Sequence, residues 1–113
     1  MIFIEKMVYG LFVVLIVTGC SMTLPVTGSI QGTKESFSGS ATGYADGSGV
    51  LTVFIENGVT CKGDFVYVTR REGEGVFTCN DGRMGPFEFV STGTRGTGTG
   101  KLDGEPFIFT FGK

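Results

Sequence analysis

Glycine and phenylalanine are unusually frequent in this chain, and their placement limits the folds that it can form. The 113 residues include 20 glycines and 11 phenylalanines, arranged in short segments rich in Val, Thr and Phe. Four Asx-Gly dipeptides, the strongest local signal for a β-hairpin turn, separate these segments. They are Asp46-Gly47, Asn57-Gly58, Asp81-Gly82 and Asp103-Gly104. The sequence therefore predicts an all-β protein built as an antiparallel meander.

About seven short strands are expected, with a further turn at residues 70–73. They are expected near residues 36–44, 49–55, 60–69, 74–79, 84–91, 97–102 and 106–112. One face of this sheet collects the apolar side chains, while Glu56, Lys62, Asp64, Glu74 and Glu88 fall on the other. An apolar face must be covered, and no helix follows the strands to cover it. We therefore expect a small barrel or half-barrel, with an open sheet as the alternative.

The strand register can be predicted from the turns, because a slip of one residue would send every side chain to the opposite face. The predicted pairing sets phenyl rings opposite glycines on neighbouring strands, so that large and small residues alternate across the apolar face. The predicted pairs are Gly63–Phe77, Phe65–Gly75, Phe77–Gly85, Phe87–Gly75, Phe89–Gly73, Gly100–Phe107, Gly98–Phe109 and Gly96–Phe111, with Tyr67–Gly73 and Cys61–Cys79 in the same register.

Three stretches form an internal repeat, at residues 47–65, 73–87 and 98–109. Each runs from a Gly-x-Gly entry through a strand and an Asx-Gly turn to a strand that carries Phe. This pattern resembles the MORN repeat at its hairpin positions, which here are Gly73, Gly75, Asp81, Gly82, Gly85 and Phe87. The resemblance implies a MORN-like hairpin architecture and no particular function.

The N-terminus is typical of an export signal. The apolar run from Met7 to Thr18 is too short for a bilayer-spanning helix of about 20 residues, but it suits the helix of a signal peptide. Val17-Thr18-Gly19-Cys20 follows, and it resembles the lipobox of bacterial lipoproteins. The resemblance implies cleavage after residue 19 and acylation of Cys20, which would anchor the protein to the membrane. We expect a signal peptide at 1–19, a lipidated N-terminus and flexible tether at 20–35, and a β-hairpin-repeat domain at 36–113.

The same resemblance indicates a location in the bacterial cell envelope. Ser21 follows the acylated cysteine, in place of the Asp that commonly retains such lipoproteins in the inner membrane. The outer membrane, with the domain facing the periplasm, is therefore favoured for a Gram-negative host.

The remaining cysteines form an even pair. Cys61 and Cys79 are set opposite each other by the predicted register, and an oxidising envelope favours a disulfide between them. A redox-active pair would need a CxxC spacing, and a metal site would need further ligands. We expect a structural bridge that stabilises the domain by roughly 3 kcal/mol.

Several function classes are disfavoured by the residues present. The chain has no histidine, and its formal charge of −2 gives no nucleic-acid footprint. Asp46, Asp81 and Asp103 each precede Gly at a turn, where Asp is favoured for conformational reasons. The stretch TRGTGTGK at 94–101 fails the phosphate-loop pattern, because no Ser or Thr follows Lys101 and no helix comes next. We expect no catalytic residues, no metal site, no cofactor and no nucleic-acid partner.

Surface residues leave two hypotheses of function open. Arg70 and Arg71 at a hairpin tip are candidate contacts for an anionic envelope component, with Arg83 and Arg95 near other turns. Aromatic residues outside the core, Tyr44 and Phe54, are candidates for a binding patch with Val66, Val68 and Val90, or equally for a contact between copies of the chain. The first hypothesis is a non-enzymatic, lipid-anchored envelope protein with a structural or protein-binding domain. The second is a small binding module that holds an envelope glycan or lipid in the mouth of a barrel.

Overall fold

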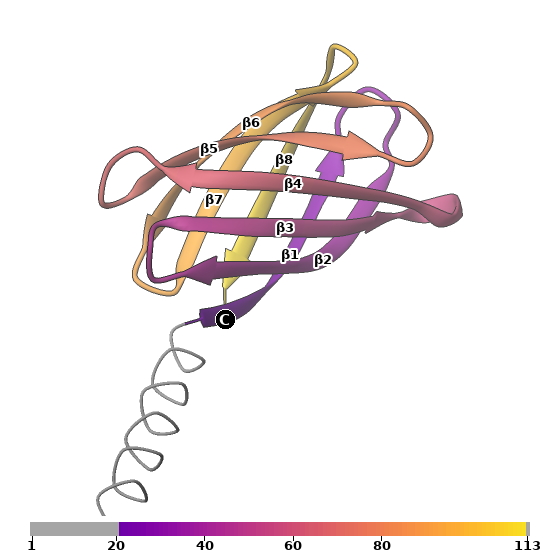
Figure 1. Ribbon diagram of the computed structural model, residues 1–113. Helices are drawn as coiled ribbons and strands as arrows, with labels where there is room; N and C mark the ends of the chain where they lie inside the picture. Colours follow the sequence, from indigo (N-terminus) through magenta and orange to yellow (C-terminus); the bar gives the residue numbers. More distant parts are fainter. Residues whose placement is uncertain (1–20, 113) are drawn as a thin grey trace, which may run out of the picture.

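The computed structural model describes residues 21–112, which form one closed antiparallel β-barrel (Figure 1). Each strand pairs with the next along the chain, and the last pairs with the first. The strands are β1 (Ser21–Ile30), β2 (Ser36–Tyr44), β3 (Ser48–Ile55), β4 (Val59–Tyr67), β5 (Glu72–Cys79), β6 (Met84–Thr92), β7 (Arg95–Leu102) and β8 (Glu105–Gly112), with a short 3₁₀ turn η1 (Glu56–Gly58). The predicted all-β meander and its barrel are confirmed, with eight strands in place of seven.

The prediction of a flexible tether over residues 20–35 is wrong for Ser21–Ile30, which form β1. This strand pairs with β2 along Ser21–Ser29 and with β8 along Val26–Ile30, and so closes the barrel. Its alternate residues Val26 and Ile30 are buried. Pro25, which cannot donate a backbone hydrogen bond, lies just beyond the last pair of the β1–β8 ladder.

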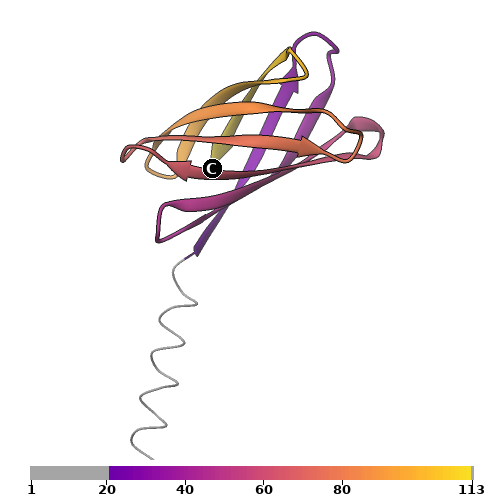
Figure 2. The ribbon, with the colours of Figure 1, turned by 45° about the horizontal axis from the view of Figure 1, so that its top comes forward.

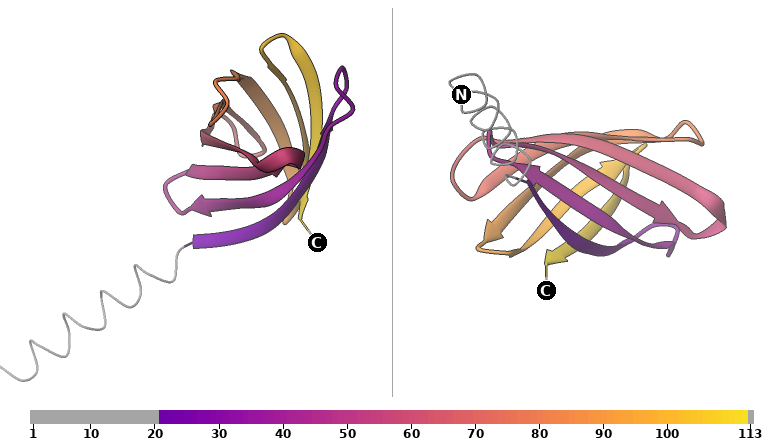
Figure 3. Two further views of the ribbon diagram at one scale, coloured as in Figure 1. Left: turned by 90° about the vertical axis from the view of Figure 1, so that its right-hand side faces the viewer. Right: turned by 60° about the horizontal axis from the view of Figure 1, so that its bottom comes forward.

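The sheet curls until β1 and β8 lie side by side (Figure 3). The hairpin between β1 and β2 also contacts the one between β7 and β8, where the Gln31 N–H donates to the Pro106 carbonyl at 2.8 Å (Figure 2). Asn57-Gly58 and Asp103-Gly104 have positive φ at both residues. Asp103-Gly104 is the two-residue turn between the paired Leu102 and Glu105, whereas Asn57-Gly58 belongs to the three-residue loop between the paired Ile55 and Val59. The predicted turn chemistry is therefore confirmed at these two hairpins.

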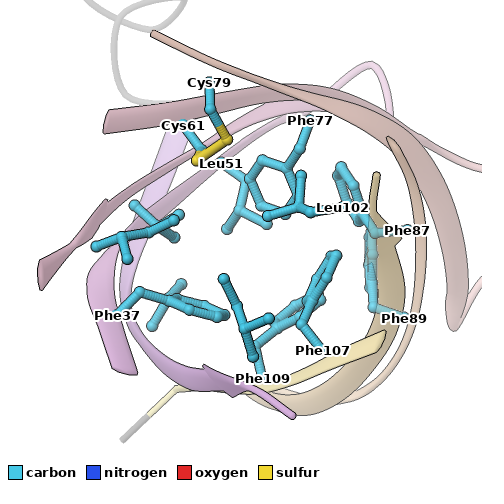
Figure 4. Close-up of a cluster of buried hydrophobic side chains, with 14 of the residues drawn as sticks. Phe37, Leu51, Cys61, Phe77, Cys79, Phe87, Phe89, Leu102, Phe107 and Phe109 are labelled. Carbon is cyan, nitrogen blue, oxygen red and sulfur yellow. A yellow bond between two sulfur atoms is a disulfide. The ribbon is translucent and has the colours of Figure 1, made fainter. Parts of the chain in front are cut away.

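The predicted register is confirmed throughout, and each predicted ring lies opposite its glycine. Figure 4 shows the rings of Phe37, Phe77, Phe87, Phe89, Phe107 and Phe109 gathered in the interior. Gly98 illustrates why no side chain is tolerated there: a Cβ at this position would overlap the ring of Phe109 and lie 2.8 Å from the Glu88 carbonyl oxygen. The glycines thus make the room that the rings occupy, as expected for a core in which large and small residues interdigitate.

The two ends of the barrel differ. The far end carries the hairpins β1–β2, β3–β4, β5–β6 and β7–β8, and the buried side chains of Ile30 and Leu102 lie near it. An ion pair also links two of its hairpins, because Arg83 Nη1 in the β5–β6 turn lies 2.9 Å from Glu35 Oε1 in the β1–β2 loop. The open end carries the β2–β3, β4–β5 and β6–β7 turns together with Ser21 and the end of β8.

Candidate functional site

Cys20 and the predicted signal peptide lie outside the described residues. Cys61 and Cys79 form the predicted disulfide, with the sulfur atoms 2.03 Å apart and the two residues paired between β4 and β5. Both side chains are buried in the core inside the barrel (Figure 4). Because both sulfurs are bonded to each other, neither cysteine offers a thiol to a substrate or a metal.

The three turn aspartates do not converge on one site. Asp46 lies at the open end, where its carboxylate accepts hydrogen bonds from the Ser48 hydroxyl and backbone N–H at 2.6 and 3.0 Å. Asp81 and Asp103 lie at the far end, where they accept from the backbone N–H groups of Arg83 and Met84. The Ser48 hydroxyl lowers the pKa of Asp46, and the Arg83 N–H lowers that of Asp81. The Asp46 and Asp81 carboxylates therefore serve their own turns, whereas that of Asp103 links the β7–β8 turn to the start of β6.

The predicted arginines are divided between the two ends of the barrel. Arg70 and Arg71 are exposed in the β4–β5 turn of the open end, and Arg95 begins β7 at the same end. Arg83 is held at the far end between Glu35 and Asp81, with its Nε 2.8 Å from the Asp81 carboxylate. Only Arg70, Arg71 and Arg95 are thus placed at one end.

A buried serine that the sequence analysis did not single out fixes the arginine turn. Ser91 donates its N–H to the Arg71 carbonyl at 2.7 Å, and its hydroxyl lies 3.2 Å from the same carbonyl. The Tyr67 hydroxyl donates to Ser91 Oγ at 3.1 Å. Thr69 Oγ1 also accepts from the Glu72 N–H within the turn. These hydrogen bonds therefore tie the backbone of the turn that carries Arg70 and Arg71 to β6.

The candidate site is an apolar cavity of about 110 Å³ at the open end, which we call the mouth. It is lined by Met22, Leu24, Ala41, Gly43, Leu51, Phe65, Tyr67, Phe89, Gly93, Phe109 and Phe111. These side chains carry no carboxylate, amine, guanidinium or thiol, and the one hydroxyl, that of Tyr67, is bonded to Ser91. The mouth can therefore hold an apolar group.

One lining position is left vacant by the fold. A Cβ built on Gly43 meets no atom within 4 Å, whereas most other inward-facing glycines face a ring or a carbonyl at close contact. The sequence analysis missed the mouth because Met22 and Leu24 were assigned to the tether. Their spacing of two residues, continued by Val26, was the available signal for an inward-facing strand.

Tyr44 and Phe54 do not share the single patch predicted for them, because they lie toward opposite ends of the described barrel. Tyr44 ends β2 at the open end, whereas Phe54 lies near the far end of β3, opposite Ser38 and Thr60. A broad shallow depression crosses β4 to β8, and its exposed apolar side chains include Val66, Val76 and Ile108 among Asp64, Glu74 and Glu88. This surface is mixed in polarity.

Within residues 21–112, no helix is long and apolar enough to cross a membrane. The same described residues contain no group of three or more metal-ligating side chains.

Comparison with known proteins identifies the fold. No protein-family model matches the chain, and no curated protein matches its sequence. A redesigned β-barrel, mFAP1, bound to DFHBI is similar in structure, with a TM-score of 0.63 and 14% identity over 80% of this chain and 92% of that chain. A de novo designed fluorescence-activating β-barrel has a TM-score of 0.61 and 13% identity, covering 80% of this chain and 90% of its own. At these identities the likeness shows the barrel fold alone.

Proposed function

We propose that this protein is a lipid-anchored, non-enzymatic binding module of the bacterial cell envelope, which takes the end of a hydrocarbon chain into its mouth. One observation carries the proposal: the apolar cavity opens at the barrel end where the chain enters from Cys20. A lipid on Cys20 would therefore begin one residue from the strand that lines the cavity.

The size and lining of the mouth favour hydrocarbon over sugar. Pockets for whole drug-sized ligands span about 300–1,000 Å³, so a cavity of about 110 Å³ suits one end of a larger molecule. A glycan would bury hydroxyl groups that need hydrogen-bond partners, and unpaired burial of such groups is costly. Methylene groups carry no such requirement, and their transfer from water into this lining is favourable.

The anchor and the non-enzymatic character rest on the sequence together with the side-chain partners. The Val17-Thr18-Gly19-Cys20 lipobox supports lipidation, and Ser21 supports delivery to the outer membrane. The chain has no histidine, and the turn carboxylates are engaged locally. The designed barrel mFAP1 holds its ligand DFHBI, which supports the view that a barrel of this kind can act as a binding module.

A second candidate function is protein binding through the outer wall. The depression over β4 to β8 exposes Val66, Val76 and Ile108, each close to half accessible. An envelope protein could cover this surface while the mouth stays free. Apolar side chains set among charged ones are usual at such non-obligate interfaces.

Calorimetric titration of the mature chain, with Cys20→Ser to remove the acylation site, tests the mouth. We use decanoate below its micelle concentration as the hydrocarbon probe and maltose as the sugar probe. We expect saturable decanoate binding, no maltose binding, and at least tenfold weaker decanoate binding in Gly43→Leu. That side chain points into the mouth from a position where a Cβ has room. Val76→Leu on the outer wall is the control and should bind as the parent does.

Decanoate binding that is unchanged in Gly43→Leu would exclude the mouth as the site, and maltose binding would favour the glycan hypothesis. The anchor is tested separately by cell fractionation of the full-length chain. Wild-type protein should sediment with membranes and Cys20→Ser should not. Retention of the unprocessed variant in membranes would contradict lipidation.

A further inference from the structure

The rim of the mouth combines exposed apolar and aromatic side chains with cations. Met22, Tyr44 and Val68 are 54%, 46% and 56% exposed, although all three are large apolar residues. Arg70 and Arg71 form the tip of the β4–β5 turn beside Val68. Arginine makes forked contacts to phosphate, and Tyr is favoured where a protein meets the headgroup region of a bilayer. The rim therefore has the composition of a surface that meets lipid.

Charge is distributed unequally between the two ends of the barrel. The turns of the open end, each taken with the first residue of the next strand, carry Arg70, Arg71 and Arg95 against Asp46 and Glu72. The turns of the far end, taken in the same way, carry Lys34 and Arg83 against Glu35, Glu56, Asp81, Asp103 and Glu105. An anionic surface therefore attracts the open end and repels the far end.

The start of β1 restricts how the anchored barrel can turn. Ser21 is already paired with Tyr44, so ordered strand begins directly after the lipidation residue proposed above. The flexible tether predicted after Cys20 is thus replaced by β1 over Ser21–Ile30. A lipid on Cys20 would bring the rim residues Met22 and Tyr44 to the bilayer surface together with the anchor.

We propose that the barrel stands mouth-first on an anionic bilayer, with Arg70 and Arg71 against lipid phosphates and Met22, Tyr44 and Val68 in the headgroup layer. This inference rests on the proposed function for the anchor, but the docking surface is a property of the barrel itself. In this orientation the mouth opens toward the bilayer, and the hydrocarbon that it receives is an acyl chain of a membrane lipid. The hydrogen bonds from Ser91 to the Arg71 carbonyl orient the β4–β5 turn for contact with lipid phosphates.

Vesicle sedimentation with the mature chain carrying Cys20→Ser tests the docking surface without the anchor. All eight strands lie within residues 21–112, so this chain contains the whole barrel. We expect binding to vesicles of phosphatidylglycerol and phosphatidylethanolamine that weakens with added salt, and at least fivefold weaker binding to phosphatidylcholine vesicles. Arg70→Glu/Arg71→Glu should lose at least fivefold on the anionic vesicles.

Lys62→Glu/Lys101→Glu is the matched control, because it changes net charge equally at exposed positions of the barrel wall. It should bind within twofold of the parent. Equal losses in the two double variants would mean that net charge alone governs binding and would overturn the proposal, as would equal binding to both vesicle types or to neither. Since no decanoate is present and Cys20 is replaced, these outcomes are independent of the mouth titration and of lipidation.

Fluorescence quenching by brominated lipid measures the orientation of the barrel on the bilayer. The chain has no tryptophan, so Tyr44→Trp places a single reporter at the rim and Phe54→Trp places one on the wall toward the far end. Vesicles containing brominated lipid should quench the Tyr44→Trp fluorescence at least twofold more than that of Phe54→Trp. Equal quenching, or stronger quenching at residue 54, would overturn the mouth-first orientation.

Discussion

Arg83 and Glu35 form an ion pair of 2.9 Å that joins the β5–β6 turn to the β1–β2 loop across the far end of the barrel. The two residues are distant in sequence and belong to hairpins whose strands are not neighbours in the sheet. Asp81 contacts Arg83 from the other side, and the Thr33 hydroxyl donates to Glu35 at 2.7 Å. This cluster brings together hairpins that the strand ladders alone would leave separate.

The cluster predicts a loss of stability in acid. The hydrogen bond from Arg83, followed by that from Thr33, lowers the pKa of Glu35 from its ordinary value of 4.5. A lowered folded-state pKa means that the contribution to stability is complete above about pH 4.5 and is lost as the pH falls through the folded-state pKa. Urea unfolding from pH 7 to pH 2.5 should therefore show Glu35→Gln to be destabilised at pH 7 and close to the parent at the acid limit. Asp64→Asn on the wall is the control; a difference for Glu35→Gln that persists in acid would contradict this account.

The disulfide predicts a large redox effect on stability. Cys61 and Cys79 close a loop with a sequence separation of 18. Opening a loop of this size should cost about 3 kcal/mol of unfolding free energy, chiefly because the unfolded chain gains freedom. Denaturant unfolding with and without dithiothreitol measures the cost. The Cys61→Ala/Cys79→Ala variant should match the reduced parent and ignore the reductant, and a reductant effect on that variant would point to another cause.

Replacing glycine by valine should have very different effects on stability at two inward-facing positions, Gly98 and Gly43. Gly98→Val should destabilise by about 3 kcal/mol, because the Glu88 carbonyl that its Cβ would meet belongs to the β6–β7 ladder and cannot simply move aside. Gly43→Val should change stability by less than about 0.5 kcal/mol, since its Cβ meets nothing and valine favours strands. Urea unfolding of both variants checks the contrast. Similar costs would show that glycine matters here for backbone conformation and not for ring packing.

Two glutamates lie directly opposite each other on the outer wall, and their repulsion can be removed. Glu74 and Glu88 are cross-strand partners in β5 and β6, and both are exposed. Like charges at such positions destabilise a sheet, so Glu88→Lys should stabilise by roughly 0.5 kcal/mol at low salt. Thermal unfolding at low and high salt measures the gain, which screening should reduce. Glu88→Gln should give a smaller gain, and a gain that ignores salt would mean that charge is not its source.

Most of the barrel could be predicted because its turns and strand pairings depend on residues that are close together in sequence. The Asx-Gly turns set the hairpins, and each ring needed a glycine opposite it, which left a single register for Phe77, Phe87 and Phe109. These constraints act between adjacent strands. They are therefore visible in sequence alone.

The first strand escaped prediction for physical reasons of its own. The loop from Gln31 to Glu35 has no Asx-Gly turn. Its residue with positive φ is Lys34, whereas a glycine at that position would have indicated a turn in the sequence. Pro25 further weakens the strand pattern of Ser21–Ile30, although the β1–β8 ladder stops before it. Because Met22 and Leu24 of this strand line the mouth, the cavity could not be predicted without it. Closure by β1, the Arg83–Glu35 pair and the Ser91 hydrogen bonds all join distant segments, and no local pattern records them.

The double pairing of β1 also has a mechanical consequence. Hydrogen bonds between antiparallel strands run perpendicular to the strands, so a pull on Ser21 along β1 loads the β1–β2 and β1–β8 ladders in shear and together. A strand held on one side only, or pulled across its length, would yield one bond at a time. β1, which directly follows the residue proposed to be acylated, can thus carry tension along its length into the barrel without unravelling.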